Sequence, residues 1–279
     1  MWAGVRRHRK FPLFSSWGAL INTASWQLPV LMLGAFFSPA IVGFYSMGFR
    51  LIQMPLSLIG GAVSQAFFQR GAEAHSSGDL GRLVEGLFNR MLIIGLLPSM
   101  ILMVIGADLF AFVFGAEWRE AGVFTQILAP WALIWFLSSP LSTVYAIQER
   151  QKEELVIHGS IFVTRISAIA IGGVLGSPRT AVALFTAGGM LAYGYLLYTI
   201  FVYSGLNLRD QLKQVIKQLA IGFAYLIPVL IVSALTQLPE IVIFILSAAL
   251  LALFYFQNKG FLMQIKQSNS SLKPGAIQK

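Results

Sequence analysis

Eight apolar runs separated by short polar segments constrain the fold of this chain more than any other feature of its sequence. Each run holds about 20 residues, the length that a helix needs to cross a hydrocarbon core about 30 Å thick. A backbone in lipid must satisfy its own hydrogen bonds, so runs of this kind fold as helices. The sequence predicts an all-α, polytopic membrane bundle, with spans over about 15–37, 39–69, 87–105, 123–147, 155–175, 181–203, 218–235 and 239–256.

The segments between these runs are predicted to lie outside the membrane. Residues 70–82 are expected to form a polar loop, and residues 108–122 an amphipathic external link. A second polar loop is expected around Arg209, Lys213 and Lys217. Within the fourth span, prolines 130 and 140 are expected to break the helix, because proline removes a backbone donor.

The runs divide the chain into four parts. Residues 1–14 are predicted to be a cytoplasmic basic segment and 15–203 a six-helix bundle. Two additional spans follow over 204–257, and 258–279 form a cytoplasmic polar tail.

The distribution of Lys and Arg predicts the orientation of the chain. Fifteen of these residues lie in the N-terminal segment, in the segments after the second, fourth and sixth spans, and in the tail. Only Arg119 and Arg179 lie in segments of the opposite side. Because cytoplasmic segments of membrane proteins are enriched in Lys and Arg, we expect both termini to be cytoplasmic.

Composition supports a membrane protein and excludes several other classes. Hydrophobic residues make up 57% of the chain and charged residues only 11%, against roughly 25% charged residues in soluble domains. The net charge of +9 arises from basic residues in short loops, which favours a topological role over nucleic-acid binding. The chain has no cysteine, which excludes disulfides, thiolate metal sites and cysteine nucleophiles.

The second run carries an arginine deep inside an apolar stretch. Arg50 lies about 15 Å from the start of a helix that begins near Pro39, which is roughly the middle of the bilayer. A charge at that depth costs at least ~2.5–3.5 kcal/mol and usually faces a watery cavity or a partner. Arg50 belongs to a stripe of polar and small residues at helical spacing, composed of Ser46, Arg50, Gln53, Ser57, Gly61 and Ser64. This stripe is predicted to be one wall of a polar path through the membrane.

A second arginine, Arg165, is predicted at a similar depth. It lies in the fifth span, which starts from the opposite side of the membrane near Leu155. One interpretation is structural: each arginine bonds helix carbonyls, snorkels to the interface, or pairs with another subunit. The other is that both line a cationic cavity for an anionic cargo, because guanidinium binds phosphate with two parallel hydrogen bonds.

Pairs of small residues four positions apart predict where helices approach closely. Three such pairs lie in the predicted spans: Ser57/Gly61, Ala168/Gly172 and Gly188/Ala192. Small side chains let helix backbones come together in membranes, so we expect these pairs at helix contacts.

Catalysis is not expected. Every Asp and Glu lies outside the predicted membrane interior, so there is no intramembrane carboxylate pair for metal-assisted chemistry. His158 lies barely one turn inside its span and is interpreted as a structural or interfacial residue. No nucleophile and base fall together, and the external segments are too short for a catalytic domain. No cofactor or metal is expected.

Two stretches carry a resemblance to a known family. The first reads RKFPLFSSWGALINTASWQLPVLMLGAFFSPAIVGFYSMGFRLIQMPLSLIGGAVSQAFFQRGAEA, and the second AEWREAGVFTQILAPWALIWFLSSPLSTVYAIQERQ. Together they resemble the central to C-terminal region of bacterial polysaccharide flippases of the MOP exporter superfamily. The resemblance is close over about residues 5–152 and rests on hydropathy beyond them.

The resemblance implies a fold, a cargo and a set of partners. Members of the family are built of two six-helix lobes around a central cationic cavity, often with two more helices. They move undecaprenyl-diphosphate-linked glycans from the cytoplasmic to the outer leaflet of the inner membrane by alternating access. For this chain the resemblance implies a multi-pass inner-membrane protein that contacts membrane lipids and lipid-linked oligosaccharide. The diphosphate would be bound by Arg50 and Arg165, with Asn22, Gln27 and Gln53 as polar lining.

The chain begins where the second lobe of such a flippase begins, so we expect a C-terminal part whose first lobe is missing or supplied by a second subunit. Alternative functions are a multidrug-type exporter of the same superfamily, a membrane glycan polymerase or ligase, and a non-transporting remnant. A multidrug exporter with cationic cargo would favour intramembrane acids, which the sequence lacks.

Overall fold

The computed structural model describes residues 10–235 and 240–260, with side chains over 23–233 and 241–260. Every regular element in these ranges is a helix, which confirms the predicted all-α class. The helices are α2 Lys10–Phe36, α3 Pro39–Ser77, α4 Leu80–Phe114, the 3₁₀ turn η1 Ala116–Trp118, α5 Arg119–Leu141, α6 Thr143–Ile147, α7 Gln151–Val174, α8 Pro178–Tyr203, α9 Leu208–Leu235 and α10 Glu240–Gln257.

The described helices make the chain a multi-pass membrane protein. Six stretches among the described residues are long and apolar enough to cross a bilayer: α3, α4, η1 to α6, α7, α8, and α9 up to Ser233. The α10 stretch Ile241–Gln257 is apolar but shorter. The first and last predicted spans correspond to α2 and α10, which are helical where predicted but are not among these six.

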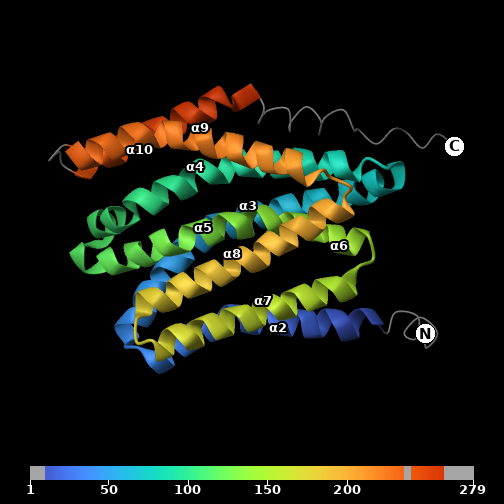
Figure 1. Cartoon of the computed structure of the whole chain (residues 1–279), viewed down its shortest axis with the longest axis horizontal. Coiled ribbons are helices and arrows are strands. Elements are labelled where there is room, and N and C mark those ends of the chain that lie inside the picture. Colours follow the sequence, from blue (N-terminus) through green and yellow to red (C-terminus); the bar gives the residue numbers. More distant parts are fainter. Residues whose placement is uncertain (1–9, 236–239, 261–279) are drawn as a thin grey trace.

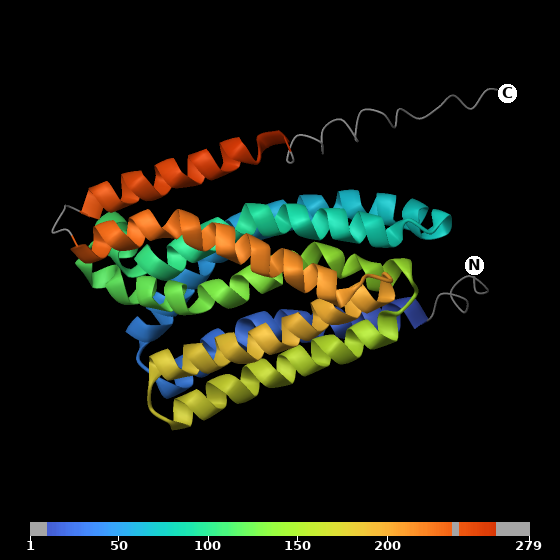
Figure 2. The ribbon, with the colours of Figure 1, turned by 45° about the horizontal axis from the view of Figure 1, so that its top comes forward.

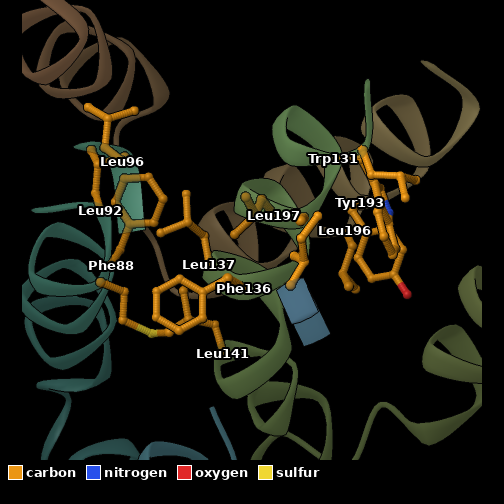
Figure 3. Packing of buried hydrophobic residues seen from close by; sticks show 14 of the residues in the cluster. Phe88, Leu92, Leu96, Trp131, Phe136, Leu137, Leu141, Tyr193, Leu196 and Leu197 are labelled. Carbon is orange, nitrogen blue, oxygen red and sulfur yellow. The ribbon is translucent and has the colours of Figure 1, made fainter. Parts of the chain in front are cut away.

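Helix α5 lies at the centre of the bundle. It packs against α3, α4 and α8, while α7 packs against α8 and α2. Helices α9 and α10 pack against α4, on the side away from α2 and α7 (Figure 1). The view in Figure 2 shows α10 at the edge of the molecule, beyond α9 and α4. Side chains from α4, α5 and α8 fill the interior (Figure 3).

The connections alternate between the two ends of the bundle. Figure 1 shows the α3–α4, α6–α7 and α8–α9 connections at one end, and the α2–α3, α4–α5 and α7–α8 connections at the other. The first group are the segments predicted to be cytoplasmic from their basic residues. The up-and-down course is therefore the one that the predicted orientation requires.

Both arginines in the segments predicted to face outward, Arg119 and Arg179, are paired with acidic residues. Arg179 on α8 donates two hydrogen bonds to the carboxylate of Glu120 on α5, at 2.6 and 2.7 Å. Arg119 donates to Asp108 Oδ1 on α4 at 2.5 Å. The two arginines that lie on the side with few basic residues therefore each have an acidic partner close by. These ion pairs also join α5 to α4 and α8.

Most residues of the two predicted polar loops are helical, so these loops were wrong over that part, and the predicted external link 108–122 is also largely helical. Residues 70–77 continue α3, and Asp108–Phe114 continue α4. The stretch with Arg209, Lys213 and Lys217 lies in α9. Hydropathy detects only the part of a helix that lies in lipid, whereas Gln, Arg, Ala and Glu also favour helix in water. Helix α3 ends instead at Gly78, whose φ of +82° gives a left-handed cap.

Of the two prolines predicted to break the fourth span, only Pro140 lies near an interruption of the helix. Pro130 lies inside α5, which continues through it. The helix is interrupted at Ser142, two residues after Pro140, and resumes as the short α6. The interruption is local because Ser142 still donates its backbone N–H to Ser138 O, at 2.9 Å.

Small residues set the closest helix approaches. A side chain at Gly122 on α5 would meet Gly106 O and lie 2.6 Å from Ala107 Cα on α4. The predicted contacts at Gly172 and Gly188 are confirmed, against Ala181 and Thr164. The predicted contact at Gly61 is wrong, because nothing described lies within 4 Å of its Cβ position.

The Gly122 contact predicts a stability difference between two glycine substitutions. Gly122→Val would force α4 and α5 apart, and overpacking of this kind costs about 1–3 kcal/mol. We expect the midpoint of thermal unfolding in detergent to fall by about 2–10 °C. The matched variant Gly61→Val has open space around its Cβ and should unfold within about 2 °C of the wild type. Equal losses for both variants would contradict the close approach.

The orientation predicts which added cysteines are accessible from outside the cell. Glu117 in η1 and Lys152 in α7 are both exposed and belong to opposite ends of the bundle. Because the chain has no native cysteine, Glu117→Cys should react with a membrane-impermeant thiol reagent on intact cells, and Lys152→Cys should not. The reverse labelling pattern would overturn the predicted orientation.

Candidate functional site

A polar cavity of about 300 Å³ lies where five helices meet. Its walls come from α2, α3, α5, α7 and α8, and they are composed of Trp26, Gln53, Trp135, Ser139, Ser142, His158, Tyr193 and Leu196. We call this cavity the polar pocket. Three of its lining residues are aromatic and most of the others carry neutral polar groups, a combination typical of sites that bind small polar molecules.

Aromatic packing positions one wall of the polar pocket. Trp26 on α2 packs edge-on against Trp135 on α5, with ring centroids 5.2 Å apart. Trp135 stacks on Trp131 one turn earlier in α5, at 6.0 Å and 12° between planes. Trp131 is buried and contacts Tyr193 of α8 at 6.3 Å, and Figure 3 shows these two side chains next to each other. The wall is therefore held from both sides by the bundle core.

The interruption after Pro140 shapes the other wall. Ser139 and Ser142 both line the pocket and flank Pro140. Ser142 Oγ donates to Ser139 O at 2.8 Å, which satisfies a carbonyl at the end of α5. The pocket therefore lies against the end of a helix, where the chain turns into α6.

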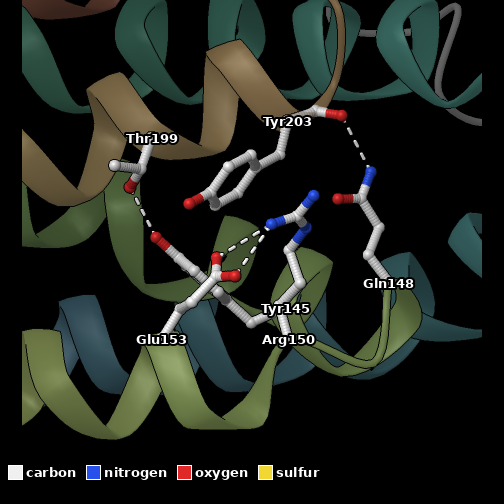
Figure 4. Close-up of polar contacts among 6 residues, drawn as sticks. All are labelled: Tyr145, Gln148, Arg150, Glu153, Thr199 and Tyr203. Atoms are coloured by element: carbon white, nitrogen blue, oxygen red, sulfur yellow. Dashed lines mark hydrogen bonds and ion pairs between the residues drawn. The ribbon is translucent and has the colours of Figure 1, made fainter.

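A polar cluster fixes α6 and the α6–α7 turn to α8 (Figure 4). Tyr145 on α6 shares a short hydrogen bond of 2.5 Å with Thr199 on α8. Gln148 donates to Tyr203 O at 2.8 Å. The guanidinium of Arg150 lies over the Tyr203 ring at 4.0 Å, and it also pairs with Glu153. These contacts hold the segment that follows Ser142, and so they fix the predicted cytoplasmic end of the pocket.

Arg165 is enclosed directly behind this wall. Its side chain is only 1% exposed, and its guanidinium carbon lies 4.2 Å from the centroid of the Trp26 ring. Nη1 donates to Ser25 Oγ at 2.8 Å and to Ser25 O at 3.2 Å, and Nη2 donates to Tyr193 Oη at 2.9 Å. These bonds join α7 to α2 and α8. The bond to Ser25 O matches the structural interpretation, in which the arginine bonds a helix carbonyl. A cargo-binding role for Arg165 stays a prediction.

Arg50 has the opposite environment. It is exposed, and it forms no ion pair or hydrogen bond within the described part of the chain. None of the six residues in its stripe is fully buried: Arg50, Ser57 and Gly61 are exposed, and the other three are half-buried. Gln53, one turn further along α3, is one of the half-buried residues and lines the polar pocket. The stripe therefore includes both an exposed arginine and a residue of the pocket.

The two remaining predicted residues lie on α2. Gln27 is exposed and is not among the residues that line the polar pocket. Asn22 lies in α2, but its side chain is outside the described residues. Among the predicted site residues whose side chains are described, Gln53 alone lines this pocket, and neither arginine does. Their roles in cargo binding stay predictions.

Sequence reasoning missed most of the pocket. Trp26, Trp135 and Tyr193 lie in apolar runs, where an aromatic residue that faces a cavity looks the same as one that faces lipid. His158 was interpreted as structural or interfacial, and it lines the pocket 3.8 Å from Glu154. The cluster of serines around Pro140 was the one available signal, because polar residues beside a helix-breaking proline are unusual inside a span.

A second, apolar groove of about 590 Å³ lies between α4, α5, α8 and α9. Its walls are formed almost entirely by Leu, Ile, Val, Met and Phe side chains, with Gln211 and Tyr198 as its polar members. Gln211 donates to Glu85 Oε1 at 2.9 Å. The groove offers apolar contact but few groups for specific recognition.

The Arg165 contacts predict a stability effect of a single hydroxyl group. Tyr193→Phe removes an acceptor from a buried cation, and a hydrogen bond to a charged group contributes about 1.5–3 kcal/mol. We expect thermal unfolding of the purified chain at a temperature lower by about 3–10 °C. Tyr195→Phe, at an exposed tyrosine two residues further along α8, should change it by less than about 2 °C. A Tyr193→Phe variant as stable as the wild type would show that the hydroxyl does not bond the guanidinium.

Comparison with known proteins gives one match. Residues 2–123 match the model of a family described as polysaccharide biosynthesis protein, which is under half of the 279 residues. No curated protein matches the chain. No solved structure matches it either. The matched stretch includes α2, α3 and α4, and so it contains the Arg50 stripe and two lining residues of the polar pocket, Trp26 and Gln53. In this part, the chain is similar to a polysaccharide biosynthesis family.

Proposed function

We propose that this chain is part of a membrane transporter for polysaccharide synthesis, which translocates lipid-linked oligosaccharide across the bacterial inner membrane. The observation that carries the proposal is Arg50 on a membrane-spanning helix, exposed and unpaired within the described residues, three positions before Gln53, which lines the polar pocket. The similarity of residues 2–123 to a polysaccharide biosynthesis family supports the same class of cargo. The role is one of binding and movement, without catalysis.

Arg50 is suited to the diphosphate of such a cargo. A guanidinium at mid-membrane depth is costly unless it meets water or an anion, and no described residue neutralises it. Its planar group can donate two parallel hydrogen bonds to a phosphate, which an ammonium cannot do. The exposed position leaves the guanidinium accessible to a bound lipid headgroup.

The same stripe implies a partner on that side of α3. Only 17% of the membrane window of α3 is buried, against 61% for the stretch that contains α5. A polar stripe that contacted lipid along its length would be unfavourable. We propose that a second helical bundle, from a first lobe or a second subunit, faces the stripe and encloses an aqueous path between the two.

The proposed function is tested by replacing Arg50. In a flippase-deficient bacterial strain that expresses the chain together with a matching first-lobe bundle, Arg50→Gln should abolish surface polysaccharide while membrane abundance stays near normal. Arg50→Lys should restore only part of the export, because an ammonium lacks the two-pronged geometry. The measurement is surface glycan per unit of membrane-inserted protein.

The matched control is Arg82→Gln. It removes the same charge from a residue at the α3–α4 connection, where the side chain is exposed and pairs only loosely with Asp79, at 3.7 Å. Export by this variant should be unchanged. Normal export by Arg50→Gln at equal abundance would remove Arg50 from the mechanism. Full export by the chain expressed without any partner bundle would contradict the proposed second bundle, unless two copies of the chain associate.

A further inference from the structure

The polar pocket differs from a phosphate site in its chemistry. None of its lining residues is Lys, Arg, Asp or Glu. Neither deep arginine is among the lining residues, and Arg165, enclosed behind Trp26, already donates three hydrogen bonds. An anion in this pocket would lose its hydration without gaining a charged partner, and burying an ion in that way is strongly unfavourable. The ligand that the pocket fits is therefore uncharged.

The aromatic side chains give the pocket an apolar wall. Trp26, Trp135 and Tyr193 come from three different helices, and their rings are fixed by contacts with each other and with Trp131. The face of an aromatic ring carries a partial negative charge, so it attracts polarised C–H groups. A pyranose ring presents such C–H groups on its faces. The wall is therefore complementary to the face of a sugar.

The polar side chains supply hydrogen bonds at the opposite edge of such a ring. The amide of Gln53 and the hydroxyl of Ser139 have no side-chain hydrogen bond within the described part of the chain. Amide and hydroxyl groups both donate and accept, as do the hydroxyl groups of a sugar. His158 adds an imidazole from α7. Neutral groups that face a cavity without partners are available to a neutral, hydroxyl-rich ligand.

We propose that the polar pocket binds one uncharged sugar ring, the sugar bonded directly to the diphosphate of the cargo. This inference rests on the proposed function and deepens it. Arg50 and Gln53 are three positions apart on α3, so their Cβ atoms lie about 5–6 Å apart on one helix face. A sugar bonded by Gln53 therefore places its attached phosphate next to Arg50. In this arrangement the polar pocket contacts the sugar ring, and Arg50 binds the phosphate attached to that sugar.

The test measures sugar binding by the purified full chain, reconstituted in an amphipol free of sugar-based detergent. The probes are neutral monosaccharides, namely glucose, galactose, N-acetylglucosamine and N-acetylgalactosamine, with inorganic pyrophosphate for comparison. Quenching of tryptophan fluorescence and the thermal unfolding temperature report binding, because two pocket residues are tryptophans. We expect at least one monosaccharide to bind saturably, and Gln53→Leu to weaken it about five-fold through the loss of a hydrogen bond.

Two comparisons keep the test specific. Gln69→Leu makes the same change at an exposed glutamine further along α3, outside the lining residues, and should bind the sugar as the wild type does. Inorganic pyrophosphate is the second comparison, and any binding of it should not depend on Gln53. The proposal of a sugar-binding pocket would be overturned if none of the monosaccharides bound. It would also be overturned if Gln53→Leu bound the sugar as tightly as the wild type. Binding of pyrophosphate weakened by Gln53→Leu would overturn it too. The export defect of Arg50→Gln is measured in cells, so the two proposals can fail separately.

Discussion

The enclosed guanidinium of Arg165 is the interaction on which the site depends. A buried cation is tolerated when most of its donors find partners, and here Nη1 and Nη2 donate to Ser25 on α2 and Tyr193 on α8, while Nε has no partner among the described residues. The Trp26 ring lies over the same group, at a distance where cation–π attraction contributes about 0.5–2 kcal/mol. Trp26 and Tyr193 also line the polar pocket. The Arg165 guanidinium, which joins α2, α7 and α8, therefore also positions two residues that line the pocket.

The sequence was sufficient to predict the helical class and the order of spans, because a chain in lipid has few ways to satisfy its backbone. Helix ends were less predictable. The segment that contains Arg70, Glu73 and His75 is polar, yet α3 runs through it, since hydropathy ends where the membrane ends and not where the helix does. Both Arg50 and Arg165 lie several turns inside their helices, as the sequence predicted, and their depth in a membrane stays a prediction.

The environment of each deep arginine could not be predicted from the sequence. Arg165 is surrounded by residues from α2, α5 and α8, which only tertiary packing brings together. Arg50 has a polar stripe along its own helix, and periodicity alone revealed it. A site built on one helix is visible in the sequence, whereas a site built between helices requires the structure.

The length of α3 has a mechanical consequence. Its 39 residues extend about 58 Å, nearly twice the thickness of a hydrocarbon core, and a tilt within the usual range of up to about 40° cannot absorb the difference. The helix that carries Arg50 must therefore extend beyond the hydrocarbon core, and it is joined to α4 by a turn at Gly78 and Asp79. From Arg50 to Ser77 the helix is about 40 Å long and contains Pro55, so if this segment moved as one body, a rotation of about 10° about Arg50 would displace its end by about 7 Å. In such a rotation, a small change near Arg50 would become a large displacement of the α3–α4 turn outside the membrane.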